Sequence, residues 1–192
     1  MAGSRRSDTR ERILKAAWQR LLRGDRARLE DVATDAGVSR QAVYLHFGSR
    51  GGLLLALVDH IDETFGLRER IAEALSGATP LERLEATLRL MARYNGEIHA
   101  IAMAFARQAH DDPDLRAAFE DRMARRRAAL RGLLEPLAHE GRLRSGWSLD
   151  EATDLLWELS APSSYEHLVV ERGWPPERFS DWLLWSARAL LA

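Results

Sequence analysis

Hydrophobic positions recur with helical spacing along nearly the whole chain. Near its start, Ile13, Ala17 and Leu21 line one face of a helix expected from about Asp8 to Arg23. Sustained period-two alternation is missing, β-branched residues are few, and no Asn-Gly or Asp-Gly pair marks a hairpin. Ala, Leu, Arg and Glu, which all favour helices, dominate the sequence. The pattern predicts an all-α fold of about nine helices.

Capping and turn residues divide this pattern into elements. A Ser or Thr followed three residues later by Glu marks a helix start, and Gly or Pro marks an end. In chain order we expect further helices over about 29–36, 40–47 and 49–75, over 79–109 with Asn95-Gly96 as a candidate break, over 112–141 with a kink at Pro136, over 148–172 with Pro162 inside, and from Phe179 to Leu191.

Residues 29–47 are the most informative stretch, because two short helices joined by a glycine-containing turn make a helix-turn-helix pattern. Ala33 is small where the second helix must cross closely, and Gly37 tolerates the positive φ of a sharp turn. Ser39 is a good N-cap for the second helix. That helix exposes side chains able to hydrogen-bond to bases or phosphates, namely Arg40, Gln41, Tyr44 and His46. An αα-hairpin with the same side chains facing solvent is the alternative.

Charge is unevenly distributed, although the 28 basic and 29 acidic residues of this 192-residue chain leave a net charge of only −1. Residues 1–52 contain eleven basic and six acidic side chains, a net charge of +5, and residues 53–192 have a net charge of −6. This split indicates two regions with different partners, unless the basic residues cluster by chance. Arg5 and Arg6 form either an arm that reaches a minor groove or a solvated tail.

Composition excludes several classes of protein. The chain has no cysteine, which excludes a disulfide scaffold, a cysteine-based zinc site and an iron–sulfur cluster. No apolar run reaches about 18 residues, so we expect no membrane-spanning helix. The charged first residues lack the apolar core of a signal peptide. We expect a cytoplasmic protein without a metal or another cofactor.

Beyond the local pattern, residues 8–58 resemble the N-terminal domain of TetR-family transcriptional regulators. The matching segments are Thr9-Arg10-Glu11-Arg12-Ile13-Leu14, Leu29-Glu30-Asp31-Val32-Ala33, Ala36-Gly37-Val38-Ser39, Ala42-Val43-Tyr44-Leu45-His46-Phe47 and Ser49-Arg50. The segment from Trp157 to Leu168 looks like the C-terminal domain of that family. The resemblance implies a three-helix DNA-binding head (residues 1–52), a long connector helix, and a helical body (residues 53–192) that binds a small ligand and dimerises.

The resemblance also implies roles for individual residues. Arg40 and Gln41 would read base edges in the major groove, and Phe47 would pack in the core of the head. Where the family often has a capping Thr before the second helix, this chain has Arg28, which would contact phosphate instead. The other implied phosphate contacts are Ser39, Tyr44, His46 and Arg50.

A second departure from the family lies at the start of the fourth helix. The family usually has Lys-Glu where this chain has Arg50-Gly51-Gly52. Arg keeps the charge and adds a forked set of donors. Each glycine lowers helix propensity by about 1 kcal/mol relative to alanine. We hypothesise that the two glycines make a soft joint between head and connector.

The last two predicted helices have apolar residues on more than one face. A surface helix needs one apolar face, so the surplus predicts burial against a second subunit as well as against the body. Filling of the chain's own core is the alternative. The interface candidates are Leu155, Leu159, Leu168, Phe179, Trp182, Leu183, Trp185 and Leu190.

A mostly apolar set with a few polar groups is the candidate lining of a small-molecule pocket, although a core is lined in the same way. Asn95 and His99 lie four residues apart on one helical face, and they would bond either one ligand together or each other. The set comprises Met91, Tyr94, Asn95, Ile98, His99, Met103, Phe119, Met123 and Trp157.

Together these features predict a ligand-responsive transcriptional regulator, interpreted as a repressor. It would bind a near-palindromic double-stranded DNA operator as a homodimer and be released by a small-molecule effector. The alternatives are an enzyme, although the sequence has no Gly-rich phosphate loop, nucleophile elbow or HExxH run, and a helical module whose head binds protein. A gel shift with the promoter next to its own gene separates the first interpretation from the last.

Overall fold

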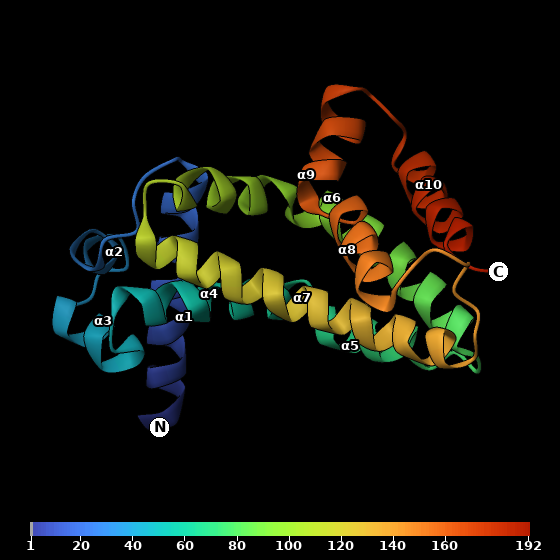
Figure 1. Ribbon diagram of the computed structural model, residues 1–192. Coiled ribbons are helices and arrows are strands. Elements are labelled where there is room, and N and C mark those ends of the chain that lie inside the picture. Colours follow the sequence, from blue (N-terminus) through green and yellow to red (C-terminus); the bar gives the residue numbers. More distant parts are fainter. Residues whose placement is uncertain (1) are drawn as a thin grey trace. The chain divides into compact units, whose positions relative to one another are not determined.

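The computed structural model describes residues 2–192, with side chains from Ser7 onward, and most of these residues are helical (Figure 1). In this part of the chain there is no strand, only one isolated bridge between Leu143 and Leu191. The predicted all-α fold is confirmed. The elements are α1 (Ala2–Leu22), α2 (Leu29–Asp35), α3 (Arg40–Phe47), α4 (Arg50–Thr64), α5 (Leu67–Ala74), α6 (Pro80–Ala109), α7 (Pro113–His139), α8 (Leu149–Leu159), α9 (Pro162–Tyr165), the π-helix η1 (Glu166–Glu171) and α10 (Pro176–Ala189).

The chain folds into two compact units, and each unit contains two segments that are separate in the sequence. The first unit comprises Met1–Thr64 and Ala100–Arg122, and the second comprises Phe65–His99 and Met123–Ala192. The helices α6 and α7 therefore each contribute residues to both units. The predicted boundary between a DNA-binding head (residues 1–52) and a body (residues 53–192) is a functional one, and it stays a prediction.

The predicted capping boxes are present. At the start of α6, the hydroxyl oxygen of Thr79 accepts a hydrogen bond from the backbone N–H of Glu82, whose carboxylate accepts one from the N–H of Thr79. Ser148 and Glu151 form the same reciprocal pair at the start of α8. These bonds satisfy backbone donors that have no partner within the helix. Both helices begin where their local sequence predicts.

The fourth helix is shorter than its apolar pattern predicts. The expected helix over 49–75 is instead divided, because α4 ends at Thr64 and α5 begins only at Leu67. Between them Gly66 adopts a left-handed conformation with φ +60°, which stops the helical hydrogen-bond ladder. With 15 residues, α4 is about 22 Å long.

The helix expected over 148–172 is also divided. It ends at Leu159, and Pro162 begins α9 at a position where a proline has no N–H to lose. The next six residues form the π-helix η1. In contrast, α6 continues through the candidate break at Asn95-Gly96, and α7 continues through Pro136.

The core of the first unit is formed where α1 packs against α2, α3 and α4 (Figure 1). The ends of α6 and α7 that belong to this unit are joined to it by polar contacts. The side-chain amide of Gln108 donates to the carbonyl oxygen of Leu21 at 3.1 Å, and Arg122 lies 3.1 Å from Asp62. The fully buried apolar side chains of α1 to α4 are Ile13, Leu14, Ala17, Leu21, Val32, Val43, Leu53, Leu54 and Leu57.

The second unit has its largest apolar cluster where residues of α6, α7, α8 and α10 meet. Leu84, Leu134, Leu156 and Ala187 are buried members of this cluster. No helix in the described part of the chain is both long and apolar enough to cross a membrane. Among the same residues, no three His, Asp or Glu side chains are grouped to hold a metal ion.

Candidate nucleic-acid interface

The turn between α2 and α3 is held by a glycine and by an arginine of α1. Gly37 adopts φ +62°, as predicted, in a region that strains other residues. A nitrogen of Arg12, Nη2, donates to the carbonyl oxygens of Ala36 and Gly37, the latter at 3.2 Å. This role of Arg12 has no signal in the sequence pattern, because its partners lie 24 and 25 residues away.

Local hydrogen bonds define both ends of α3. The hydroxyl oxygen of Ser39 accepts from the N–H of Ala42 at 3.1 Å, which confirms the predicted N-cap. At the other end, Gly48 adopts φ +72° and its N–H donates to the carbonyl oxygen of Tyr44 at 2.8 Å. The eight residues of α3 are therefore fixed in extent and register.

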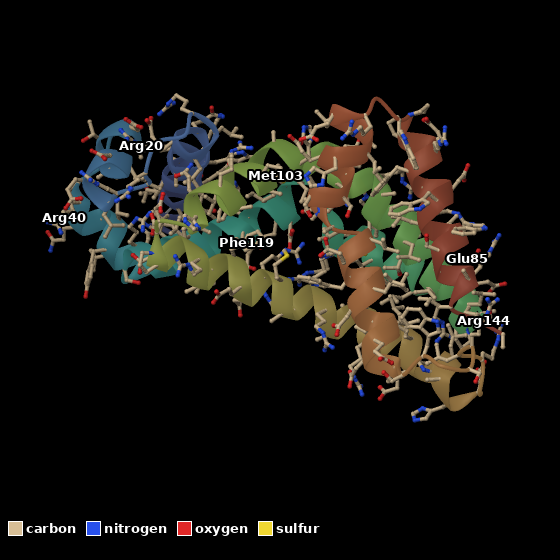
Figure 2. The ribbon with its side chains drawn as sticks, turned by 45° about the horizontal axis from the view of Figure 1, so that its top comes forward. Arg20, Arg40, Glu85, Met103, Phe119 and Arg144 are labelled. Carbon is tan, nitrogen blue, oxygen red and sulfur yellow. The ribbon has the colours of Figure 1, made fainter. Side chains whose placement is uncertain are left out.

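One side of α3 faces solvent, and the other side is buried in the core of the head. Residues four apart share a helix face, so Arg40 and Tyr44 form one exposed column and Gln41 and Leu45 form the next. Tyr44 is 61% exposed and Leu45 is 71% exposed, whereas Val43 is fully buried. Figure 2 shows Arg40 at the outer side of α3. Of the four exposed residues, only Leu45 is absent from the predicted contacts.

The remaining polar residue of α3 is less accessible. His46 is half-buried, with its ring centroid 5.9 Å from that of Phe47. The guanidinium of Arg10 lies 5.8 Å from the centroid of the Phe47 ring. The His46 side chain is less exposed to solvent than that of Tyr44. Its contact with phosphate stays a prediction.

Two arginines, one at the start of α3 and one at the start of α2, remain accessible. Arg40 lies 3.2 Å from Glu30, and both side chains are more than half exposed. Exposed ion pairs contribute at most about 1 kcal/mol, so Arg40 can exchange this partner for another at low cost. Arg28 is the exposed N-cap residue of α2 and makes no side-chain capping bond. The side chains of Arg5 and Arg6 lie outside the described residues, so the arm stays a prediction.

Several carboxylates of the head are paired within it. Arg20 lies 2.7 Å from Asp35 and 3.5 Å from Asp31, and Arg23 lies 3.4 Å from Asp35. Two acidic side chains, Asp31 and Asp35, are thus paired with arginines. These internal pairs leave the net charge of the head unchanged, at +5.

Arg50 has a different partner from the predicted phosphate. Its two terminal nitrogens contact the carboxylate of Asp112 at 2.6 and 2.7 Å, and Asp114 lies at 3.2 Å. Its Nε donates to the carbonyl oxygen of Ala27 at 2.9 Å. Only 18% of the Arg50 side chain and 7% of the Asp112 side chain are exposed. The hydrogen bond from Arg50 lowers the pKa of Asp112, although burial opposes this shift.

The two glycines after Arg50 differ in their surroundings. A Cβ on Gly52 would lie 2.1 Å from the carbonyl oxygen of Phe47, whereas a Cβ on Gly51 would meet no atom closer than 3.8 Å. The N–H of Gly52 also donates to the hydroxyl oxygen of Ser49, at 3.0 Å. Gly52 therefore allows α4 to begin against the end of α3. This close approach of two backbones is a separate reason for a glycine at position 52, and the soft joint stays a hypothesis.

The nine candidate pocket residues are divided between the units. Met103 and Phe119 belong to the first unit (Figure 2), and the other seven belong to the second. Within the second unit, Tyr94 is buried and the indole N–H of Trp157 donates to the carbonyl oxygen of Met123 at 3.2 Å. The pocket role of the set stays a prediction.

Asn95 and His99 use separate partners. The buried side-chain amide of Asn95 donates to the carbonyl oxygen of Ser160 at 3.0 Å. The Nε2 atom of His99 lies 4.0 Å from the carboxylate of Glu166. The pair therefore links α6 to the α8–η1 region of the second unit through two different contacts.

The eight interface candidates also fall into two groups. Phe179, Leu183 and Leu190 are buried within the chain, so they have almost no surface left for a second subunit. Trp185 is 69% exposed. The half-buried candidates are Leu155, Leu159, Leu168 and Trp182.

Comparison with known proteins identifies the family of the N-terminal region. Residues 13–57 match the family model described as bacterial regulatory proteins, tetR family. The HTH-type transcriptional regulator TtgR of Pseudomonas putida is 37% identical over 76 residues, which are 38% of this chain and 36% of that protein. The nucleoid occlusion factor SlmA of Vibrio atlanticus is 38% identical over 95 residues, 47% of each protein. The chain thus matches between a third and a half of the length of these curated relatives.

Solved structures match nearly the whole chain. A TetR-family transcriptional regulator from Rhodococcus sp. has a TM-score of 0.74 and 23% identity, covering 97% of this chain and 100% of that one. NalD of Pseudomonas aeruginosa, described as the secondary repressor of the MexAB-OprM multidrug efflux pump, has a TM-score of 0.73 and 22% identity, covering 97% of each chain. At these identities the likeness shows the fold. Residues 13–57 thus match the tetR family of bacterial regulatory proteins, and the chain has the fold of a solved TetR-family regulator.

Proposed function

We propose that the chain is a transcriptional regulator that binds double-stranded DNA through α3. The observation that carries the proposal is the exposed side of α3, where Arg40, Gln41 and Tyr44 face solvent on a helix whose other side is buried. The major groove of B-DNA, about 12 Å wide, accommodates an α-helix. Arginine forms bidentate hydrogen bonds with guanine, and glutamine does so with adenine.

Phosphate contacts would position α3 in the groove. Arg28, Ser39, Tyr44 and His46 carry donors on or beside the two helices of the motif. Arg50 differs, because its charge is already neutralised by Asp112. We assign Arg50 to positioning of the head instead of phosphate contact.

The regulator would act as a homodimer. Two heads, each formed by residues 1–52, would enter successive major grooves about 34–36 Å apart on a near-palindromic operator. Residues 53–192 would supply the dimer contact through the last two helices. The exposure of Trp185 on α10 supports this assignment, because tryptophan is enriched among residues that anchor interfaces.

A small-molecule effector in the body would release the dimer from DNA, which is the behaviour of a repressor. Two structures of the same fold support a ligand-binding role. A regulator from Saccharomonospora viridis in complex with choline has a TM-score of 0.69 and 21% identity, and FadR of Bacillus subtilis in complex with stearoyl-CoA has a TM-score of 0.70 and 18% identity.

Substitution of α3 tests DNA binding. Arg40→Ala is expected to weaken binding to the promoter next to the protein's own gene by roughly 5- to 150-fold, because a bidentate base contact contributes about 1–3 kcal/mol. Tyr44→Ala is expected to weaken binding to all duplexes alike. Gel shifts measure both, with Arg144→Ala, an exposed arginine of the second unit (Figure 2), as the unchanged control. Undiminished binding by both α3 variants would contradict the proposal.

Substitution of Trp185 tests the dimer. Trp185→Ala is expected to raise the dimer dissociation constant at least about 30-fold, the effect of removing an interface anchor. Sedimentation equilibrium measures the constant. The matched control is Trp147→Ala, which removes an exposed tryptophan outside the last two helices. An unchanged constant for the Trp185 variant would place the interface elsewhere.

A further inference from the structure

Leu45 is more exposed than any other large apolar side chain in the part of the chain that the structure describes, at 71%. A single exposed leucine is common on protein surfaces and has no meaning by itself. The position of Leu45 makes its exposure significant, because it lies on the solvent-facing side of α3 between Tyr44 and the end of the helix. Folding leaves most of this side chain open to solvent.

Leu45 shares its column of α3 with Gln41, one turn earlier. The column therefore combines one amide with one apolar side chain, and the caps at Ser39 and Gly48 fix their register. An A·T pair displays a matching combination in the major groove. The N6 amino group of adenine donates a hydrogen bond to the amide oxygen and N7 accepts one from the amide nitrogen, and the 5-methyl group of thymine packs against an apolar side chain.

From this juxtaposition, and resting on the proposed DNA-binding function, we propose that Leu45 is a specificity-determining residue that packs against the 5-methyl group of a thymine in each half-site. Gln41 then hydrogen-bonds to an adenine about two base pairs away, because four residues of α3 rise about 6 Å and successive base pairs lie about 3.4 Å apart. The contact is apolar, so it adds sequence preference without adding a phosphate contact or changing the salt dependence of binding.

The test removes only the methyl group. Duplexes bound by the full-length protein are first selected from a random pool, and each thymine of the selected duplex is then replaced in turn by deoxyuridine, which pairs identically. At one thymine per half-site, the replacement is expected to weaken binding by the wild type roughly fourfold, the effect of one buried methyl group. Leu45→Ala is expected to bind the thymine duplex more weakly and to be insensitive to uridine at that position.

A leucine on another element provides the matched control. Leu75→Ala truncates an exposed leucine of the second unit, and it should keep both the affinity and the uridine sensitivity of the wild type. Equal uridine sensitivity of wild type and Leu45→Ala at every position would overturn the role of Leu45 and leave DNA binding intact. A pool from which no duplex is enriched would instead overturn the proposed function itself. Matching thermal unfolding curves show that the exposed substitution leaves the fold unchanged.

Discussion

Replacing Asp112 with alanine is expected to lower the free energy of unfolding by about 3–5 kcal/mol, the cost of leaving one member of a buried ion pair alone. Asp112 receives both terminal nitrogens of Arg50 at 2.6 and 2.7 Å, and neither side chain is more than 18% exposed. Without this carboxylate the guanidinium would remain desolvated beside the exposed Asp114. Urea denaturation of the full chain measures the loss.

The neighbouring acid supplies the control. Asp111 is largely exposed, so Asp111→Ala should change the free energy of unfolding by no more than about 0.5 kcal/mol. Because the pKa of Asp112 is held below its ordinary value of 3.8, the stabilisation is complete above that pH and is lost as the pH falls through the lowered pKa. A loss below about 1 kcal/mol at neutral pH for Asp112→Ala would show that the pair contributes little.

The same site separates a positioning role of Arg50 from a phosphate contact. The double substitution Arg50→Met with Asp112→Leu removes both charges and keeps apolar volume, which is often tolerated when a buried pair is replaced. If Arg50 only positions the head, the salt dependence of DNA binding by this variant is unchanged. A salt slope reduced by about one would instead assign a phosphate contact to Arg50.

The second large effect is expected for Gly52→Ala, which should destabilise the protein by about 3 kcal/mol. The new Cβ would lie 2.1 Å from the carbonyl oxygen of Phe47. Both groups belong to the backbone ends of α3 and α4, so a side-chain rotation cannot relieve the contact. Thermal or urea unfolding measures the effect, and loss of DNA binding should accompany it because α3 must shift.

Gly51→Ala is the matched comparison. The nearest atoms to a Cβ at this position are 3.8 and 3.9 Å away, an ordinary contact distance. Alanine should therefore stabilise the first turn of α4 by up to about 1 kcal/mol through its helix propensity. A stabilising effect at both glycines would favour the soft joint and contradict the close approach of Gly52 to Phe47.

Much of this molecule follows from residues close together in the chain. Ser39 caps α3 through a donor three residues away, and Ser148 and Glu151 start α8 in the same manner. The helix-turn-helix depends on Gly37, whose positive φ is a local backbone property. Since each of these signals acts within one helical turn, the sequence was sufficient to predict the all-α fold and the helix-turn-helix.

Other features depend on partners that lie far away in the sequence. Arg50 had the charge of a phosphate contact, but a carboxylate 62 residues later neutralises it. The apolar surplus of α10 did not reveal which of its residues face inward, and the structure buries Phe179 while exposing Trp185. The sequence by itself determined where helices form and which chemical groups they carry. Only the tertiary structure decided which of those groups face solvent, because burial and pairing depend on neighbours that packing brings together.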